Sequence, residues 1–174
     1  MANPLPNDIH TTDGETYRSP AHPQMVAALG RAQWNFFSLD ETVVAILYEA
    51  GEFSLVSGRS LTAGDKAKCL RKLIARLEGE GAPQDVADAL KKAETAFDHA
   101  RASYRNALSH AHPFTAGYAQ DGTYLPGLAH TTKHLQTVLA REAADLHEIA
   151  HRIEDAISPL GDAREALKRL PQKP

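Results

Sequence analysis

Apolar residues recur at alternating spacings of four and three along the middle of the chain. The positions are Val86, Leu90, Ala93, Phe97, Ala100, Tyr104 and Leu108. This period keeps all of them on one face of an α-helix, and Pro83 suits the first turn of such a helix. Because Pro113 disfavours helical conformation at the residue before it, the sequence predicts one long helix from about residue 83 to about residue 112.

Three other segments have the same helical period. Residues 25–50 and 62–79 each carry an apolar stripe, and Thr62 with Asp65 gives a helix N-cap signal before the second stripe. Residues 132–157 repeat the pattern, so we expect a fourth long helix there. The apolar residues of that segment include Leu135, Val138, Leu139, Leu146, Ile149, Ile153 and Ile157.

Shorter elements are expected after the third and fourth helices. Asp121-Gly122 is a strong turn signal between tyrosine-bearing arms and predicts a short hairpin or ordered loop. Pro159 and Gly161 interrupt the fourth helix, and residues 162–170 then predict a short C-terminal helix. The expected fold is therefore all-α: an antiparallel four-helix bundle with a hairpin or loop insert between helices 3 and 4.

Length and composition suit one soluble domain. The chain has 174 residues, of which 43% are hydrophobic and 24% charged, and we expect a single helical domain over residues 23–170 behind a flexible N-terminal arm, residues 1–22. Cys69 is the only cysteine, so no intrachain disulfide can form. No export signal or long apolar run is evident, and we expect a cytoplasmic protein that binds no membrane. A net charge of −3 argues against a protein that coats nucleic acid.

The first helical segment is apolar over an unusually large part of its circumference. One seam contains Leu29, Phe36, Val43 and Leu47, and a second contains Trp34, Phe37, Val44 and Tyr48. A helix with two such seams can pack inside its own bundle and against another subunit. The pattern therefore favours a homodimer.

Polar residues gather near the end of the long central helix. If Tyr104 points into the core, Arg105, Asn106 and His110 project from the far side, where packing does not require them. Asn106 and His110 are four residues apart and share one strip of the helix. Their side chains can converge on a molecule that lies against that face.

Histidine and arginine are the residues that metal-free RNA cleavage needs. A proton acceptor activates the 2′-hydroxyl, a proton donor assists the leaving oxygen, and a cation stabilises the transition state. Imidazole can do either proton transfer, and guanidinium binds phosphate oxygens in a fixed fork. One histidine and one arginine are barely enough, but two copies of the chain at a two-fold axis would supply a second pair.

This motif resembles the signature of HEPN domains: in RNALSH, Arg105 is followed by the polar Asn106 and, after four intervening positions, by His110. The resemblance extends from about Met25 to Ile157 and includes Trp34 followed by Asp40-Glu41. It implies a dimerising helical bundle, and in many members a metal-independent endoribonuclease that serves as a toxin or in phage defence and uses no cofactor. Carried over, Arg105 would bind the scissile phosphate, His110 would be the general acid or base, and Asn106 would position them.

Other readings of the same motif stay open. Some members of the family are inactive or bind RNA, nucleotides or a protein partner, such as an antitoxin, without cutting. Cations at a helix C-terminus also interact favourably with its free carbonyl groups, so Arg105 and His110 can serve as ordinary capping residues. Asp40, Glu41 or Glu49 could orient Arg105 as an ion-pair partner.

Two histidine pairs raise the alternative of a metal site. His147, Glu148 and His151 form the HExxH pattern of zinc peptidases, in which two histidines bind zinc and the glutamate activates water. The extended form of that motif, with its third ligand, is missing, so a solvated helix flank is favoured over a peptidase. His130 and His134 form a second pair with the same spacing, too far along the predicted helix to share a metal with the first.

The predicted hairpin carries aromatic residues that suit nucleic acid. Tyr118 and Tyr124 flank the turn, and tyrosine rings stack on bases in proteins that bind single strands. Tyrosines of this kind more often pack a hairpin onto its bundle.

Overall fold

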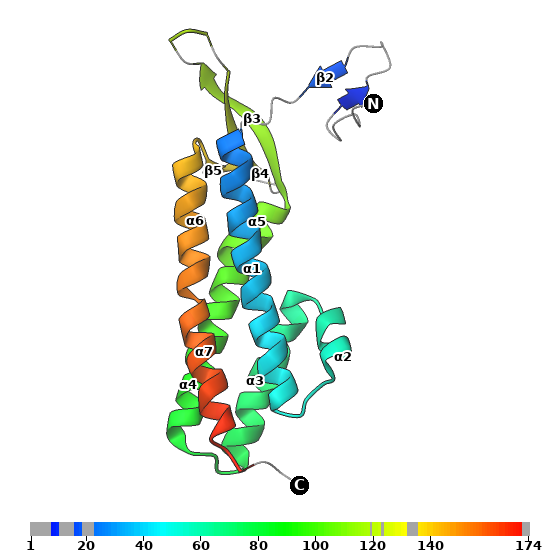
Figure 1. Cartoon of the computed structure of the whole chain (residues 1–174), viewed down its shortest axis with the longest axis vertical. Helices are drawn as coiled ribbons and strands as arrows, with labels where there is room; N and C mark the ends of the chain where they lie inside the picture. The colour runs from blue at the N-terminus through cyan, green and yellow to red at the C-terminus, as the bar shows by residue number, and fades with distance from the viewer. Residues whose placement is uncertain are drawn as a thin grey trace.

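The computed structural model describes residues 8–10, 16–18, 23–118, 120–122, 124–131 and 136–171. Helices lie side by side along an elongated body, and a β-sheet stands at one end of it (Figure 1). The helices are α1 (Pro23–Glu49), α2 (Leu55–Ser60), α3 (Ala63–Gly79), α4 (Gln84–His99), the π-helix η1 (Ala100–Arg105), α5 (Asn106–Ser109), α6 (Ala143–Asp155) and α7 (Ile157–Lys168). The strands are β1 (Asp8–His10), β2 (Thr16–Arg18), β3 (Ala111–Tyr118), β4 (Tyr124–Thr131) and β5 (Gln136–Ala140).

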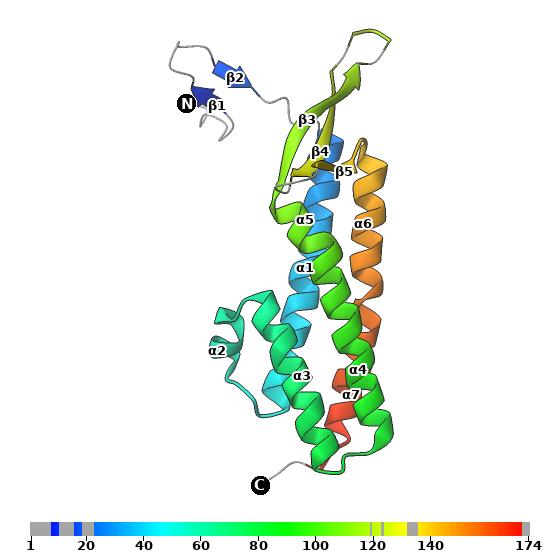
Figure 2. The same cartoon turned by 180° about the vertical axis from the view of Figure 1, so that it is seen from behind.

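The helices form long columns that run the length of the body (Figures 1 and 2). Helix α1 packs against α6 and α7, which follow one another in a second column. Helices α4, η1 and α5 make a third column, and α4 packs against both α7 and α3. Four helical columns were predicted, but α3 accompanies the others along only part of their length (Figure 2).

The core lies between these columns and matches the predicted apolar stripes. The rings of Phe36 in α1 and Phe97 in α4 stack with centroids 6.1 Å apart. In the long central stripe, Tyr104 is half-buried and the other members are buried. The N-cap of α3 is also as predicted, because Thr62 Oγ1 accepts a hydrogen bond of 3.1 Å from the backbone N–H of Asp65.

A charged pair lies between helices α1 and α3. The ammonium group of Lys66 donates to Oδ2 of Asp40, and the Lys66 side chain is almost fully buried. Oδ1 of the same Asp40 is buried as well and accepts no hydrogen bond within the described part of the chain. The pair therefore joins the two helices through polar groups that are largely removed from water.

The prediction of an all-α fold is wrong, because residues 111–140 contain a three-stranded antiparallel sheet in the order β3-β4-β5. The segment expected to begin the fourth helix contributes strand β5, and the helix itself starts only at Ala143. Val138 and Leu139 fit a helical period, but pairing of β5 with β4 buries Ala140 and decides the conformation. Leu135 lies outside the described residues.

A local signal marks where α6 begins. The Asp145 carboxylate accepts hydrogen bonds from the backbone N–H groups of Arg141 at 2.7 Å and Glu142 at 3.3 Å. Glu142 and Asp145 together form a capping box. Such a box satisfies N–H groups that have no partner within the helix. The box places the start of α6 well inside the predicted fourth helix.

The predicted hairpin is confirmed and is longer than expected. Strands β3 and β4 pair from Ala111↔His130 to Tyr118↔Tyr124, with a bulge between Thr115 and Gly117. Gly122 in the turn has φ of 81°, a conformation that glycine adopts without strain.

Three other boundaries differ from the sequence-based expectations. Residues 51–60, which lie between the first two predicted helices, contain the short helix α2. Helix α7 begins at Ile157, before the expected break, because Pro159 lies in its first turn, where backbone N–H groups lack helical partners anyway. Within the expected N-terminal arm, β1 pairs with β2, and the remaining residues of that segment lie outside the described part.

Candidate functional site

The candidate site lies where the α4-η1-α5 column meets the sheet (Figure 1). Arg105 ends the π-helix and Asn106 begins α5. Arg105 Nη1 donates a hydrogen bond of 3.3 Å to Asn106 Oδ1, and both side chains are half-buried. Single π-helical turns within α-helices occur frequently at functional sites. The structure therefore brings together two of the three predicted site residues, next to an uncommon backbone feature.

His110 follows α5 as its C-cap and is exposed. Its ring stacks against the ring of His130, with centroids 6.0 Å apart and an angle of 28° between the planes. His130 belongs to β4 and pairs with Ala111, the residue after His110. A second imidazole is thus supplied by the same chain.

Arg105 and His110 do not touch directly. Among the described residues, no hydrogen bond or ion pair links them, and Ser109 Oγ donates instead to the Arg105 carbonyl at 2.7 Å. Within the described part of the chain, no carboxylate pairs with the Arg105 guanidinium either. The cation is therefore available to a phosphate that approaches this end of the column.

The three carboxylates considered as partners of Arg105 are occupied elsewhere. Asp40 binds Lys66, Glu41 binds Arg59 at 2.8 Å, and Glu49 binds Arg164 at 2.6 Å. The hydrogen bonds that Arg59 donates to Glu41 raise the pKa of Arg59, and those that Arg164 donates to Glu49 raise the pKa of Arg164. These carboxylates hold α1 to its neighbours and do not orient the site.

The HExxH segment lies on α6 with its polar side chains exposed. Glu148 accepts a hydrogen bond of 2.8 Å from Arg152, whose pKa is raised chiefly by that contact. His151 Nδ1 lies 3.7 Å from Glu154, and His147 points to solvent. No group of three His, Cys, Asp or Glu side chains that could hold a metal occurs among the described residues. The arrangement is that of a solvated helix flank.

The second histidine pair is not on a helix as expected. His130 lies in strand β4, and His134 falls outside the described residues. Of the two hairpin tyrosines, Tyr118 is 71% exposed, and the side chain of Tyr124 lies outside the described part. One exposed aromatic ring, that of Tyr118, therefore lies near the tip of the hairpin.

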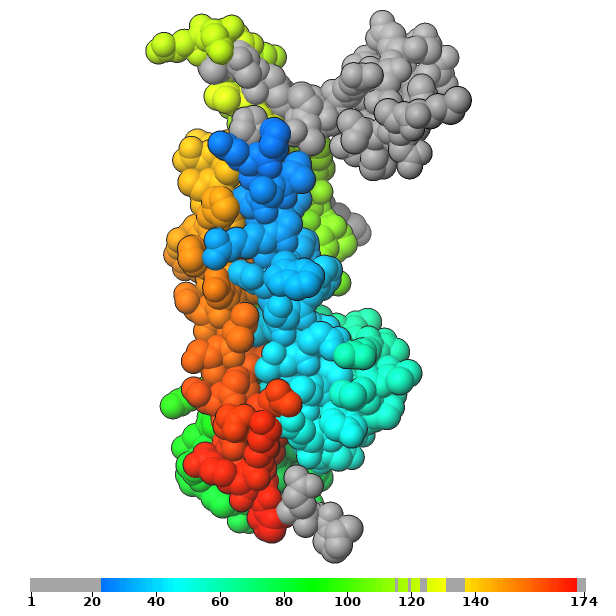
Figure 3. Space-filling model, in the orientation of Figure 1, coloured from blue at the N-terminus to red at the C-terminus, as the bar shows by residue number. Residues whose placement is uncertain are grey.

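The two apolar seams of α1 have different environments. Phe36, Val43 and Leu47 of the first seam are buried in the bundle. In the second, α2 covers Val44, whereas Trp34 and Phe37 are 71% and 60% exposed. Figure 3 shows much of α1 uncovered along the front of the molecule. We call the exposed side chains of Val26, Trp34 and Phe37 the α1 apolar face.

His130 is a site residue that the spacing of its segment conceals. His130 and His134 fit the start of the predicted fourth helix, although the turn at Asp121-Gly122 indicates a hairpin. In the structure, the buried residues Gly127 and Ala129 alternate with less buried residues along β4, as the two faces of a strand do. Extending the hairpin along that alternation places His130 beside the end of the central helix.

No protein-family model matches the chain, and comparisons with curated proteins and with solved structures found no match either. Among the described residues, no helix combines the length and the apolar character needed to cross a membrane.

Proposed function

We propose that the chain is a metal-independent endoribonuclease of the HEPN type, with Arg105, Asn106, His110 and His130 as its site. The observation that carries the proposal is the stacking of His110 on His130 at 6.0 Å, beside an arginine without a carboxylate partner in the described structure. Two imidazoles and one cation supply the proton acceptor, the proton donor and the positive charge that transesterification of RNA uses.

Each of the two histidines performs one proton transfer of the reaction. One imidazole accepts the proton of the 2′-hydroxyl while that oxygen attacks phosphorus, and the other protonates the 5′ oxygen as the bond between it and phosphorus breaks. The products are a 2′,3′-cyclic phosphate and a 5′-hydroxyl end. Arg105 stabilises the negative charge on the phosphate oxygens, and Asn106 holds the guanidinium through the bond between their side chains.

The substrate and biological setting belong to the same proposal. Tyr118, exposed at the hairpin tip, suits stacking on an unpaired base of RNA. The α1 apolar face suits a second copy of the chain, and a dimer would double the number of sites. We propose a cytoplasmic toxin or phage-defence role, in which an antitoxin or other protein partner restrains cleavage.

The test is cleavage of total RNA and of a tRNA pool in excess EDTA, with analysis of the new ends. We expect cleavage that survives the chelator and leaves cyclic phosphates. His110→Ala, His130→Ala and Arg105→Ala should each reduce the rate by about 100-fold or more. His147→Ala is the matched control, since this exposed histidine lies on α6, and it should cleave at the wild-type rate.

Two results would contradict the proposal. One is cleavage that EDTA abolishes, and the other is a folded wild-type protein that binds RNA without cutting it. The second result would favour a non-catalytic binding module. The exposed α1 apolar face also supports that alternative, because such patches mark interaction surfaces.

A further inference from the structure

Part of the β-hairpin projects from the body of the molecule as a two-stranded arm. Strand β5 pairs with β4 only from Leu128 to Thr131, so residues 124–127 of β4 pair with β3 alone in the described structure. We call residues 114–118 and 124–127 the hairpin arm. Figures 1 and 2 agree that it extends past the start of α1 and away from the helices. Two-stranded hairpins are only marginally stable in water, so such an arm gains from a surface on which it can pack.

One face of the hairpin arm carries an exposed leucine with open space beside it. Leu125 is 41% exposed and is the register partner of Gly117, where a Cβ would meet nothing within 4 Å. Tyr118 follows Gly117 in β3, and successive residues of a strand point to opposite faces. Leu125 and Tyr118 therefore lie on different faces of the arm, and these faces can contact different partners.

The α1 apolar face has a hollow between two of its side chains. Gly30 lies one helical turn after Val26 and one turn before Trp34, so the three share one side of α1. Gly30 is exposed, and a Cβ there would meet nothing within 4 Å. Glycine weakens an exposed helix interior relative to alanine, and packing among the described residues gives no reason for it here. A side chain from another molecule can enter between Val26 and Trp34.

Both surfaces lack the charges that would select a charged partner. Residues 111–131 include no lysine or arginine, and Asp121 is their only carboxylate. Binding of an RNA backbone relies on such cations, so the arm suits an apolar surface better than phosphates. Beside the α1 apolar face, Glu41 lies one turn after Phe37 and pairs with Arg59 at 2.8 Å. The two surfaces can therefore meet without burial of an unpaired charge.

We propose that the hairpin arm of each subunit in a dimer packs on the α1 apolar face of the other subunit. Leu125 enters the hollow over Gly30, and the exposed ring of Trp34 occupies the open space at Gly117. Because the arm points away from its own α1, the contact forms between subunits, and a two-fold axis makes it twice (Figure 1). This inference rests on the dimer of the proposed function and does not depend on RNA cleavage.

The dimensions of the two elements permit this exchange. Residues 114–118 span about 15 Å, at about 3.3 Å per residue of strand. Gly30 lies seven residues, or about 10 Å, after the start of α1. An arm that runs alongside α1 of the other subunit can therefore reach the hollow.

The area of contact also favours a reciprocal exchange. The exposed parts of Trp34 and Phe37 amount to roughly 250 Å². A standard interface buries about 800 Å² on each partner, so a single contact of one arm with one α1 apolar face falls short of that size. In the exchange each subunit contributes both an arm and a face, which doubles the area that it buries.

The first test is cross-linking between two separately purified full-length proteins, one of which carries a size tag. Both contain Cys69→Ser, so that the single cysteine comes from Leu125→Cys in one protein and from Val26→Cys in the other. After mixing, a short bismaleimide reagent should give a covalent dimer of mixed size. Val56→Cys replaces Val26→Cys in the control, because Val56 is exposed on α2 outside the α1 apolar face, and it should give little of that product.

The second test is the dissociation constant of the dimer, measured by sedimentation equilibrium. Leu125→Glu buries a charge in the contact and Gly30→Leu fills the hollow, so each should raise the constant by about tenfold or more. Tyr118→Glu places the same charge on the other face of the arm and should leave the constant unchanged. Circular dichroism verifies the fold of each variant.

The outcomes separate the exchange from the dimer itself. A dimer whose dissociation constant Leu125→Glu leaves unchanged would overturn the exchange and leave the dimer of the proposed function standing, as would equal cross-linking with Val56→Cys and Val26→Cys. A wild type that stays monomeric would overturn both, whereas RNA cleavage tests the catalytic residues separately. Weaker RNA binding by Leu125→Glu, with an unchanged dimer, would assign this face of the arm to RNA and contradict the exchange.

Discussion

Nζ of Lys66 lies 2.5 Å from Oδ2 of Asp40, and only 3% of the Lys66 side chain is exposed. A buried ion pair of this kind costs desolvation energy on both sides, so its net contribution to stability is small even though each partner depends on the other. The pair offers a strong test of the structure. Replacing one partner should lower the free energy of unfolding, and replacing both should restore most of it.

Lys66→Met should lower the free energy of unfolding by about 3–5 kcal/mol, since it leaves the Asp40 carboxylate half-buried without its cation. The double variant Lys66→Met/Asp40→Leu should recover most of that loss. Urea unfolding of four proteins, the wild type, Lys66→Met, Asp40→Leu and the double variant, measures both effects. Additive losses in the double variant would contradict the ion pair.

Gly127→Ala should destabilise the sheet. A Cβ at this position would lie 2.6 Å from Phe114 Cε1 and 3.0 Å from the Ala140 carbonyl oxygen, so the aromatic ring or strand β5 must move. We expect a loss of about 1–3 kcal/mol by thermal or urea unfolding. Gly117→Ala is the control, because a Cβ there meets nothing within 4 Å. Equal stability of the two variants would contradict the packing of Phe114 on Gly127.

Trp34→Glu combined with Phe37→Glu should convert a dimer to a monomer. Both side chains are largely exposed within one chain, so the charge is costly only if another subunit covers them. Light scattering after size exclusion measures the mass. Val138→Glu places one such charge at another exposed apolar position and should leave the mass unchanged. A wild type that is monomeric at high concentration would contradict the dimer.

Thr62→Ala should shorten or fray the start of α3. The lost N-cap costs about 1 kcal/mol. The hydrogen bond from Thr62, followed by Lys68, also lowers the pKa of Asp65 below its usual value. A lowered pKa in the folded state contributes stability that is present above the unfolded pKa of about 4 and is lost as the pH falls through the folded value.

The stability difference between wild type and Thr62→Ala should therefore be largest near neutral pH and shrink in acid. Unfolding curves between pH 7 and pH 3 measure it. A difference that grows on acidification would contradict the contact between Thr62 and the Asp65 carboxylate.

The helical half of the fold was predictable because local and long-range signals agree there. The apolar residues that recur from Val86 to Leu108 pack in one core with apolar residues of α1. Thr62 caps the start of α3, as the sequence signal predicts. In residues 132–140 the signals conflict, since Val138 and Leu139 fit a helix by spacing and a strand by pairing. Pairing with β4 is a long-range effect that no local window contains.

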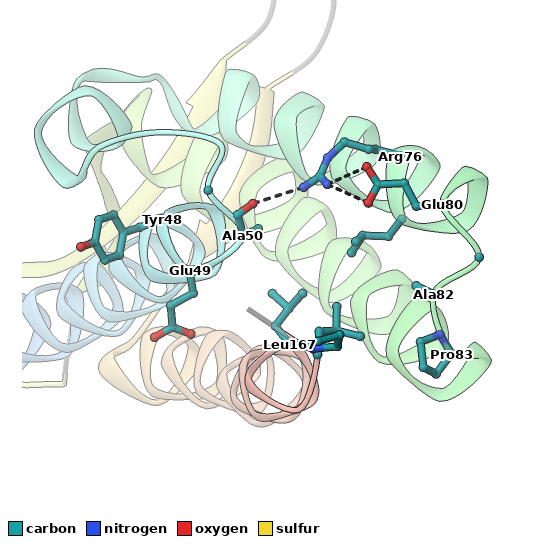
Figure 4. A pocket seen from close by; sticks show the side chains of 13 residues that line it. Tyr48, Glu49, Ala50, Arg76, Glu80, Ala82, Pro83 and Leu167 are labelled. Carbon is teal, nitrogen blue, oxygen red and sulfur yellow. Dashed lines mark hydrogen bonds and ion pairs between the residues drawn. The ribbon is translucent and has the colours of Figure 1, made fainter. Parts of the chain in front are cut away.

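The site was predictable only in part for the same reason. Arg105, Asn106 and His110 form a motif within one turn and a half of helix and could be identified from spacing alone. His130 reaches the site through the register of the hairpin, and the bulge between Thr115 and Gly117 shifts that register. A cavity of about 670 Å³ lined by Leu77 and Leu167 depends on the ends of α1, α3 and α7, which are far apart in the sequence (Figure 4).

Helix α1 has 27 residues and is therefore about 40 Å long. Its last turn lines a cavity of about 670 Å³ together with α3 and α7, and its earlier turns present Trp34 and Phe37 on the surface. The same helix therefore connects the two places. If binding at one of them changes the affinity at the other, binding at the second must change the affinity at the first by the same factor, because linked equilibria are reciprocal.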